Sequence, residues 1–391
     1  MKILFTHRYY YPDTSPYALM LRSIATHFAQ GGHDVHVFAS KPSYRDVENA
    51  SDTDDVENIS VKRCWVFREN RHNLLTRVLN VFMYCSGLFF TILRQRPDIV
   101  TASTFPPVIA AWSASLAARI VGAKFIYHMQ DVHPEVSKYS GGRLGRGLPF
   151  WLLRKLDNQS LRRASAIVVL SEDMANTLRA RDIGDLPITV INNFLLDSFG
   201  ANNIAPPQYK KSPGKYQLIF AGNLGRFQNL PLLVDGVARC FERHPELELF
   251  FLGDGAALPD LLKNWGDHPQ VRFAPFMPFA QASELIAEAD VGLVSLTPDM
   301  YRVSFPSKMM TYLGLGIPVL ALVEAESALA REIEVCGLGV VPANSNPTAI
   351  ETAVESILMQ PDCSIALRDW NRSNVSFGSA VKRWQNMIDR L

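Results

Sequence analysis

One short segment of this chain carries residue types that can hold a phosphate group. In residues 305–323, FPSKMMTYLGLGIPVLALV, Pro306 and Ser307 are typical helix-start residues and Lys308 falls in the first expected turn. A helix N-terminus presents backbone N–H groups without partners, and a lysine there adds a full positive charge. Arg302, just upstream, offers a second cation for the same anion. The segment predicts an anion site; the alternative is an ordinary capped helix with a solvated lysine.

A second segment supplies glycines and a further cation. In residues 221–229, AGNLGRFQN, Gly222 and Gly225 permit close backbone approach, and Arg226 can bind a phosphate through two N–H groups. The turn Gly253–Gly255 follows another expected strand, although GDG is common in turns. These loops therefore favour contacts to an anionic ligand.

A third segment indicates acid–base chemistry. Residues 128–135, HMQDVHPE, place two histidines and two carboxylates directly after an expected strand. Such groups can transfer protons or bind substrate hydroxyls. In the alternative interpretation this is a hydrogen-bonded loop, and only one of the four residues meets the substrate. The spacing fits no standard set of metal ligands.

The elements that position these segments follow from the pattern of the chain. Short β-rich runs alternate with amphipathic helices almost throughout, which predicts βαβ units and parallel sheets covered on both faces. The loop after the first expected strand, residues 6–16, lacks the GxGxxG fingerprint of dinucleotide-binding proteins. In the first half the expected strands are Lys2–Thr6, Asp34–Ser40, Val61–Phe67, Asp98–Ala102, Lys124–His128, Ala166–Leu170 and Thr189–Ile191, and the expected helices are Tyr17–Gln30, Val108–Ile120, Pro149–Arg163 and Glu172–Arg181.

A break in this alternation predicts two domains. Residues 197–213, DSFGANNIAPPQYKKSP, show no hydrophobic period and are rich in Asn, Pro and Lys, as in a linker. We expect two Rossmann-like α/β domains facing each other across a cleft, residues 1–197 and 214–370, with a linker at 198–213 and a C-terminal helix within 371–391. In the second half the expected strands are Gln217–Phe220, Glu248–Leu252, Val271–Phe273, Val291–Leu296, Val319–Val323 and Gly339–Val341, and the expected helices are Leu230–Arg243, Ala257–Trp265, Ala280–Ala287, Ser307–Leu313, Pro347–Met359 and Ser379–Leu391.

Composition narrows the function classes. A formal net charge of +1 over 391 residues argues against a nucleic-acid-binding protein, which usually has a strong basic excess. The five cysteines are scattered without CxxC spacing, which is typical of a reducing compartment and predicts no structural zinc. The N-terminal apolar run is too short for a signal peptide, so a cytoplasmic location is expected.

One segment suggests contact with a membrane. Residues 78–93, VLNVFMYCSGLFFTIL, are apolar except for Asn80 and Ser86, and arginines flank them on both sides. Sixteen residues are short for a transmembrane span, which needs roughly 20. Apolar residues with basic flanks suit a helix that lies in the membrane interface. A helix buried against a sheet is the alternative.

The loops above, in this order, resemble those of the family 4 retaining glycosyltransferases of GT-B fold. The similar segments are QDVHPE, IVVLSEDM, INNFLLDSF, AGNLGRFQN, LGDG and FPSK…YLGLGIPVL, and they cover nearly the whole chain. The resemblance is to the subgroup that builds bacterial surface polysaccharides such as lipopolysaccharide. It implies transfer of a sugar from a nucleotide diphosphate-sugar, usually UDP-linked, with retained anomeric configuration and without a metal or other cofactor. It also implies a sugar or lipid-linked acceptor at the inner membrane face.

The resemblance assigns donor contacts by position. Gly222, Asn223 and Gly253 match loops that contact the donor diphosphate, and Arg226 falls where this subgroup often has a basic residue. Ser307 and Lys308 match the helix start that faces the donor phosphates and ribose. Two glutamates that are usual in the family would fall at Val303 and Thr311, of which only Thr311 can offer a hydrogen bond.

Catalytic and acceptor contacts are expected in the N-terminal domain. The 128–135 loop matches the catalytic loop, so that either His128 or Gln130–Asp131 occupies the place of the histidine that touches the transferred sugar. We expect His128 and Asp131 to be catalytic. His133, Glu135 and Ser15 are the expected acceptor contacts. A non-catalytic partner subunit with the same fold and a nucleotide-sugar 2-epimerase are the alternative functions.

Overall fold

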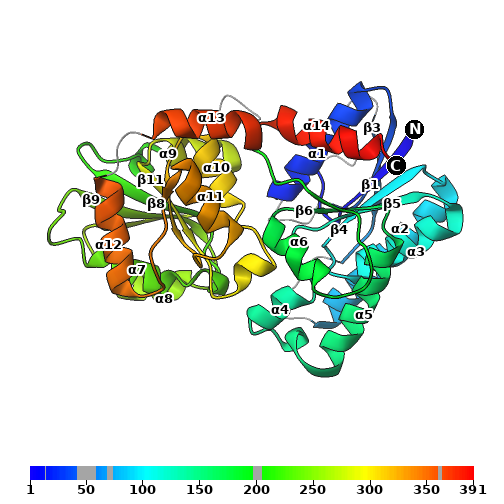
Figure 1. Ribbon diagram of the computed structural model, residues 1–391, viewed down its shortest axis with the longest axis horizontal. Helices are drawn as coiled ribbons and strands as arrows, with labels where there is room; N and C mark the ends of the chain where they lie inside the picture. Colours follow the sequence, from blue (N-terminus) through cyan, green and yellow to red (C-terminus); the bar gives the residue numbers. More distant parts are fainter. Residues whose placement is uncertain (14, 42–58, 68–73, 197–204, 360–362) are drawn as a thin grey trace. The chain divides into compact units, whose positions relative to one another are not determined.

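The computed structural model describes residues 1–13, 15–41, 59–67, 74–196, 205–359 and 363–391. The chain forms two compact units (Figure 1). Unit 1 contains Met1–Ile191 and Val381–Leu391, and unit 2 contains Asn192–Ala380. Residues 42–58, part of the expected linker (197–204) and three shorter segments lie outside the described residues.

Unit 1 is built on a parallel sheet with strand order β3-β2-β1-β4-β5-β6-β7. The four central strands are almost wholly buried, as expected when helices cover both faces of a parallel sheet. The strands are β1 (Lys2–Thr6), β2 (Asp34–Ser40), β3 (Ile59–Cys64), β4 (Ile99–Ser103), β5 (Lys124–His128), β6 (Ala166–Val169) and β7 (Ile188–Val190).

The helices of unit 1 connect these strands. Helices α2, α3 and α5 pack side by side, with α3 in the middle. The helices are α1 (Pro16–Gln30), α2 (Leu74–Gln95), α3 (Ile109–Val121), α4 (Glu135–Tyr139), η1 (Arg143–Gly145), α5 (Gly147–Arg163) and α6 (Glu172–Arg179). Helix α14 (Phe377–Ile388) begins in unit 2, and its residues from Val381 onward belong to unit 1.

Unit 2 repeats the plan with a parallel sheet of order β10-β9-β8-β11-β12-β13. Its core joins strands β8, β9, β11 and β12 to α7 and α12 through aliphatic and phenylalanine side chains. The strands are β8 (Tyr216–Asn223), β9 (Leu247–Asp254), β10 (Val271–Ala274), β11 (Val291–Ser295), β12 (Val319–Leu322) and β13 (Gly339–Val340). The helices are η2 (Pro207–Tyr209), η3 (Arg226–Gln228), α7 (Leu230–Ala238), α8 (Leu258–Trp265), α9 (Phe279–Ala287), η4 (Met300–Arg302), α10 (Lys308–Gly314), α11 (Ala328–Cys336), α12 (Pro347–Leu358) and α13 (Ser364–Asn374).

The predicted fold class, two Rossmann-like halves, is therefore confirmed. The description of single helices differs from the expectations at several points. Leu230–Arg243 is helical only as far as Ala238, and α11 and α13 were not predicted. Ser307 precedes α10 but has helical dihedral angles, and its side chain makes no capping hydrogen bond.

The apolar segment 78–93 lies inside α2, which has 22 residues. Among the described helices, α2 alone is long and apolar enough to cross a membrane, with a mean hydropathy of 1.4 over the apolar stretch, of which 33% is buried. Its sides differ: Tyr84, Leu88 and Ile92 are fully buried, whereas Phe82 and Phe90 are each 68% exposed. One side of α2 is thus buried, as the alternative interpretation predicts, and the other side is exposed.

Candidate functional site

In unit 2, two predicted loops lie next to each other at the carboxyl edge of the sheet. Strands β8 and β9 pair to their last residues, with Gly222 opposite Gly253 and Asn223 opposite Asp254. A Cβ atom on Gly253 would lie 2.0 Å from the carbonyl oxygen of Gly222, and the φ of Gly253 is +143°. Only glycine fits such a conformation and contact, so the close approach of the two loops requires it.

Helix α10 is fixed to the same edge by a buried tyrosine. The Tyr312 hydroxyl accepts a hydrogen bond from the backbone N–H of Ala221 at 2.8 Å. The Tyr312 ring also lies against Gly292 of β11, where a Cβ atom would approach the ring to 2.3 Å. These contacts hold the first turn of α10, and Lys308 with it, beside the β8 loop.

Lys308 has an unusual environment for a lysine. Its ammonium lies 3.2 Å from the centre of the Phe220 ring, on β8, and is buried. Among the described groups it has no hydrogen-bond partner. Burial lowers the pKa of Lys308 well below its usual value. The described residues therefore provide this desolvated amine with an aromatic face but no counter-ion, which an anionic ligand would supply.

The other predicted donor contacts are less closely defined. Ser307 is exposed, Thr311 is half-buried on α10, and the backbone of Arg226 begins η3. Arg302, the second expected cation, forms an exposed ion pair with Asp299. Val303 is fully buried, so position 303 belongs to the core rather than to a polar site.

In unit 1, His128 lies at the end of β5 in a buried cluster of polar and aromatic residues. Its Nδ1 atom is 2.9 Å from the Tyr17 hydroxyl, and its Nε2 atom is 3.0 Å from the side-chain amide of Gln130. Its ring packs edge-on against Trp384 of α14, with the ring centres 5.0 Å apart. Burial, assisted by His7, lowers the pKa of His128 to about 3. His128 is therefore a neutral imidazole with both ring nitrogens in contact with other groups.

Glu135 takes part in a buried ion-pair network. Its carboxylate accepts hydrogen bonds from Arg181 at 3.0 and 2.6 Å. Arg181 also donates to Asp157 at 2.5 Å and to the carbonyl oxygen of His133 at 2.7 Å. Although burial opposes the charge, Asp157 and Glu135 raise the pKa of Arg181. This network anchors the loop that carries Asp131.

The remaining predicted residues of unit 1 have local surroundings of their own. Burial lowers the pKa of His133, and the negative charge of the neighbouring Asp131 partly opposes this shift. Ser15 is the N-cap of α1, and its hydroxyl accepts from the N–H of Ala18 at 3.4 Å. The structure thus brings His128 together with Tyr17, and Glu135 with Arg181, whereas Ser15 stabilises a helix start.

Several residues of these clusters were missed by sequence reasoning. Tyr17, Trp384 and Arg181 lie far from the 128–135 motif along the chain, and no local pattern links them to it. Tyr312 lies inside the predicted 305–323 segment but resembles an ordinary core residue of a short helix. In the part of the chain that the structure describes, no group of three or more His, Cys, Asp or Glu side chains is placed to hold a metal ion.

The second of the two Rossmann-like units thus carries two glycine-containing strand ends and a buried lysine. The sequence matches the family described as "Glycosyl transferase 4-like domain" over residues 17–193. It matches "Glycosyl transferases group 1" over residues 215–360. The chain belongs to the family 4-like glycosyltransferases of GT-B fold.

Individual relatives agree with this placement. The chain is similar to "Probable glycosyltransferase WbjE" from Pseudomonas aeruginosa, with 26% identity over 323 residues and 79% of each chain covered. The fold is similar to that of Anabaena HepE in complex with UDP-glucose, with a TM-score of 0.69, 17% identity and all of both chains covered. It is also similar to sucrose-phosphate synthase from Thermosynechococcus elongatus, with a TM-score of 0.75, 12% identity, and 100% and 98% of the two chains covered.

Proposed function

We propose that this glycosyltransferase moves a sugar from a UDP-linked donor to a sugar or lipid-linked acceptor during bacterial polysaccharide synthesis. The observation that carries the proposal is the buried ammonium of Lys308, which lies beside the glycine loops of β8 and β9 and has no counter-ion among the described residues. A nucleotide diphosphate supplies that counter-charge. The solved complex of HepE with UDP-glucose, which has the same fold, supports a UDP-linked donor.

In this proposal unit 2 binds the donor. Backbone groups of Gly222, Asn223 and Gly253 contact the diphosphate, with Arg226 and Lys308 providing positive charge. Negative charge grows on the leaving diphosphate as the bond to the sugar breaks, and fixed cations stabilise that charge most strongly in a water-poor site. No metal is needed for this step, because the cations lie on the chain itself.

Unit 1 binds the acceptor in this proposal. His128 is a poor general base, because burial holds its pKa at about 3 and both ring nitrogens already contact other groups. We assign it to holding the 128–135 loop in place, with Asp131 orienting the acceptor hydroxyl or the transferred sugar. Retention follows if the acceptor attacks the sugar on the face that the diphosphate leaves. The departing phosphate oxygen then takes the acceptor proton.

A donor screen tests the proposal. Purified protein is incubated with UDP-, GDP-, ADP- and dTDP-sugars, and thermal stabilisation and slow sugar hydrolysis are measured with and without EDTA. We expect one UDP-sugar to stabilise the protein and to be hydrolysed regardless of EDTA, with the α-anomer retained in the released or transferred sugar. Interconversion of the UDP-sugar at C2 without hydrolysis would indicate an epimerase. Absence of binding to every donor would favour a non-catalytic subunit.

A further inference from the structure

The three adjacent helices of unit 1, α2, α3 and α5, are unusual in charge. Helices α2 and α3 contain no Asp or Glu, and the single carboxylate of α5, Asp157, is fully buried against Arg181. Their cations are exposed or half-buried and include Arg77, Arg94, Arg119, Lys155 and Arg162. We call this side of the unit, formed by α2, α3 and α5, the basic face. It carries positive charge without any exposed carboxylate on the helices that form it.

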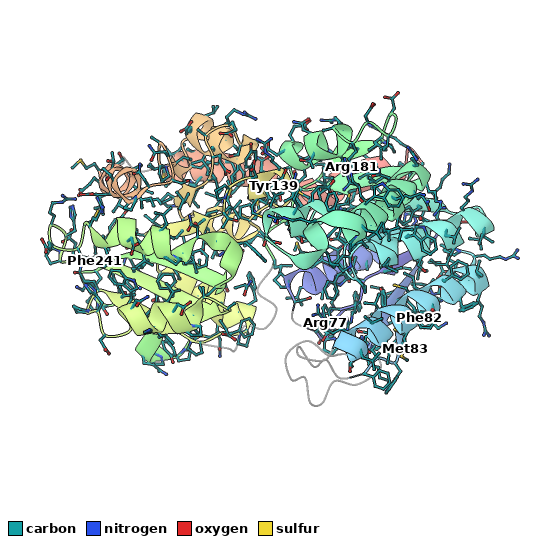
Figure 2. All side chains as sticks on the ribbon, turned by 90° about the horizontal axis from the view of Figure 1, so that it is seen from below. Arg77, Phe82, Met83, Tyr139, Arg181 and Phe241 are labelled. Atoms are coloured by element: carbon teal, nitrogen blue, oxygen red, sulfur yellow. The ribbon has the colours of Figure 1, made fainter. Side chains whose placement is uncertain are left out.

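Large apolar side chains project from the same helices. Single exposed apolar residues are normal on protein surfaces, but here they recur along two helices. On α2 they follow a helical stripe, and Figure 2 labels Arg77, Phe82 and Met83 on this helix. The six most relevant are Leu75, Val78, Phe82, Phe90, Leu148 and Trp151, which are between 55% and 68% exposed. Mixed cations and aromatic residues on one face are typical of a surface that meets lipid headgroups.

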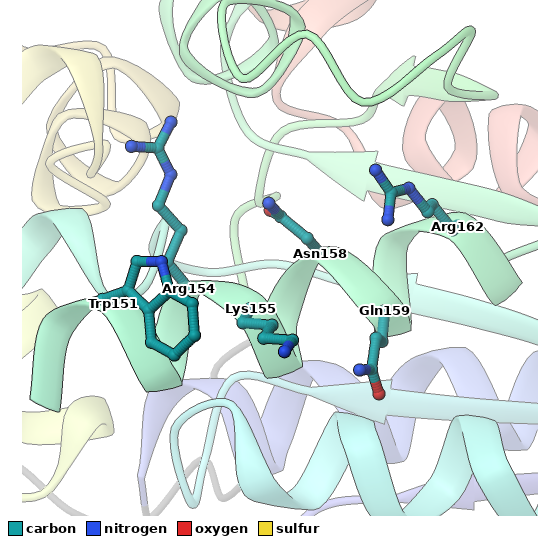
Figure 3. A pocket seen from close by; sticks show the side chains of 6 residues that line it. All are labelled: Trp151, Arg154, Lys155, Asn158, Gln159 and Arg162. Carbon is teal, nitrogen blue, oxygen red and sulfur yellow. The ribbon is translucent and has the colours of Figure 1, made fainter. Parts of the chain in front are cut away.

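A groove on α5 concentrates both features. Figure 3 shows its lining, Trp151, Arg154, Lys155, Asn158, Gln159 and Arg162, all from this one helix. The cavity has a volume of about 340 Å³. Residues 151, 155 and 159 form one ridge and residues 154, 158 and 162 the next, because side chains four positions apart follow one another along a helix. Three cations and a tryptophan therefore surround a single hollow.

Contacts with neighbouring residues hold part of this lining in place. Gln159 accepts a hydrogen bond from the indole N–H of Trp112, on α3, at 3.0 Å. The Lys155 ammonium lies 5.1 Å from the centre of the Trp151 ring. Arg154 approaches Glu135 only through its Nε atom, at 3.6 Å, while Glu135 is already paired with Arg181. Arg154 thus shares the carboxylate of Glu135 with Arg181, and Lys155 and Arg162 form no ion pair with another described residue.

We propose that the α5 groove binds the phosphate of an anionic lipid headgroup and that the basic face docks unit 1 on the bilayer. A phosphate satisfies the cations, and the adjoining Leu148 and Trp151 enter the apolar boundary below it. A lipid is favoured over an acidic protein because exposed cations and large exposed apolar side chains occur together along both α2 and α5. The inference rests on the proposed function in one respect: the enzyme must reach a lipid-linked acceptor at a membrane.

Sedimentation with vesicles tests this proposal on the full chain. We expect binding to phosphatidylcholine vesicles that contain phosphatidylglycerol, and little binding to phosphatidylcholine alone. The groove variant Arg154→Gln/Lys155→Gln/Arg162→Gln should bind on the order of a hundredfold more weakly, since each cation near an anionic surface contributes about 1 kcal/mol. The control Lys263→Gln/Arg372→Gln/Lys382→Gln removes the same charge from exposed positions elsewhere, and its binding should be close to that of the wild type.

A second variant and a competitor separate the explanations. Leu148→Ser/Trp151→Ser should also weaken vesicle binding while the thermal unfolding of the protein is unchanged, because both side chains are exposed. Glycerol phosphate at matched ionic strength should not release the protein; complete release would show a site for soluble anions and overturn the proposal. Equal losses in the groove and control variants, or binding to neither vesicle, would also overturn it. Hydrolysis of the UDP-sugar in solution, measured on the same variants, reports on the proposed function independently.

Discussion

Replacing Lys308 by Met should stabilise the protein and impair the reaction at the same time. A buried amine that makes no hydrogen bond costs about 1–3 kcal/mol relative to its hydrated state. Methionine has a similar length, and its thioether can keep the contact with the Phe220 ring. We therefore expect the free energy of unfolding to rise by about 1–3 kcal/mol. Loss of a cation that stabilises the leaving diphosphate should lower kcat by about 10²–10³.

The pH dependence of stability gives an independent measure of the same residue. Burial lowers the pKa of Lys308 in the folded protein below the ordinary value of 10.5, so the unfolded chain binds one more proton between the two values. Stability contributed through this group therefore rises with pH across that window, and it levels off below the folded-state pKa, where both states are protonated. The slope should be smaller in Lys308→Met. A diphosphate favours the charged amine, so donor binding should take up a proton only in the wild type.

Urea unfolding over a range of pH measures the stability and its pH dependence. Calorimetric UDP titration in buffers of different ionisation enthalpy measures the proton uptake, and donor hydrolysis measures the turnover. Lys263→Met, at an exposed position of α8, is the matched control and should change none of them. The reasoning is refuted if Lys308→Met unfolds as easily as a protein with a core cavity, or if its hydrolysis rate equals that of the wild type. In either case the buried ammonium would be a structural group.

Four further substitutions test other parts of the two units. Arg181→Met leaves the carboxylates of Glu135 and Asp157 buried without their cation, so urea unfolding should show a loss of about 3–5 kcal/mol. Tyr17→Phe removes the hydroxyl beside His128 and should lower the stability by about 1 kcal/mol. It should reduce the rate of transfer to an acceptor more than the rate of donor hydrolysis, and equal losses in both rates would argue against an acceptor-side role for Tyr17. Gly253→Ala forces a Cβ atom against the Gly222 carbonyl, so UDP affinity should fall by about tenfold or more, and an unchanged Kd would show that this loop lies away from the donor. Val303→Glu places an unpaired carboxylate at a fully buried position and should cost about 3–5 kcal/mol without improving donor affinity, as thermal unfolding and UDP titration would show.

Much of the fold was predictable because parallel strands leave a clear pattern. Strands β1, β2 and β5 match their expected bounds, since each is a short apolar run closed by polar or turn residues. Helix α10 was also expected, from the helix-start residues Pro306 and Ser307. The end of α7 was missed because Arg239–Arg243 keeps a helical pattern while the backbone turns away after Ala238. Periodicity gives the type of an element more reliably than its last residue.

The surroundings of the candidate residues could not be predicted in the same way. Lys308 was expected at an anion site, but its burial over Phe220 depends on how α10 packs on β8, nearly ninety residues earlier in the chain. Glu135 has the residue type of an acceptor contact, yet its carboxylate is held by Arg181. A sequence motif shows which groups are available, and only tertiary packing shows which of them are already paired.

The buried residue Val303 affects how many negative groups the donor site of the proposed function contains. The family's usual carboxylate would fall at Val303, which is fully buried in this chain. The valine packs the loop before α10 into the core, so the replacement of the carboxylate changes the packing of this loop as well as removing one contact. A site without that carboxylate has fewer negative groups near the donor phosphates, and the ammonium of Lys308 has none beside it among the described residues. In the proposed function, the donor diphosphate supplies the counter-charge that this lysine lacks among the described residues. Donor recognition in this chain should therefore depend more on the diphosphate than on the hydroxyls of the transferred sugar.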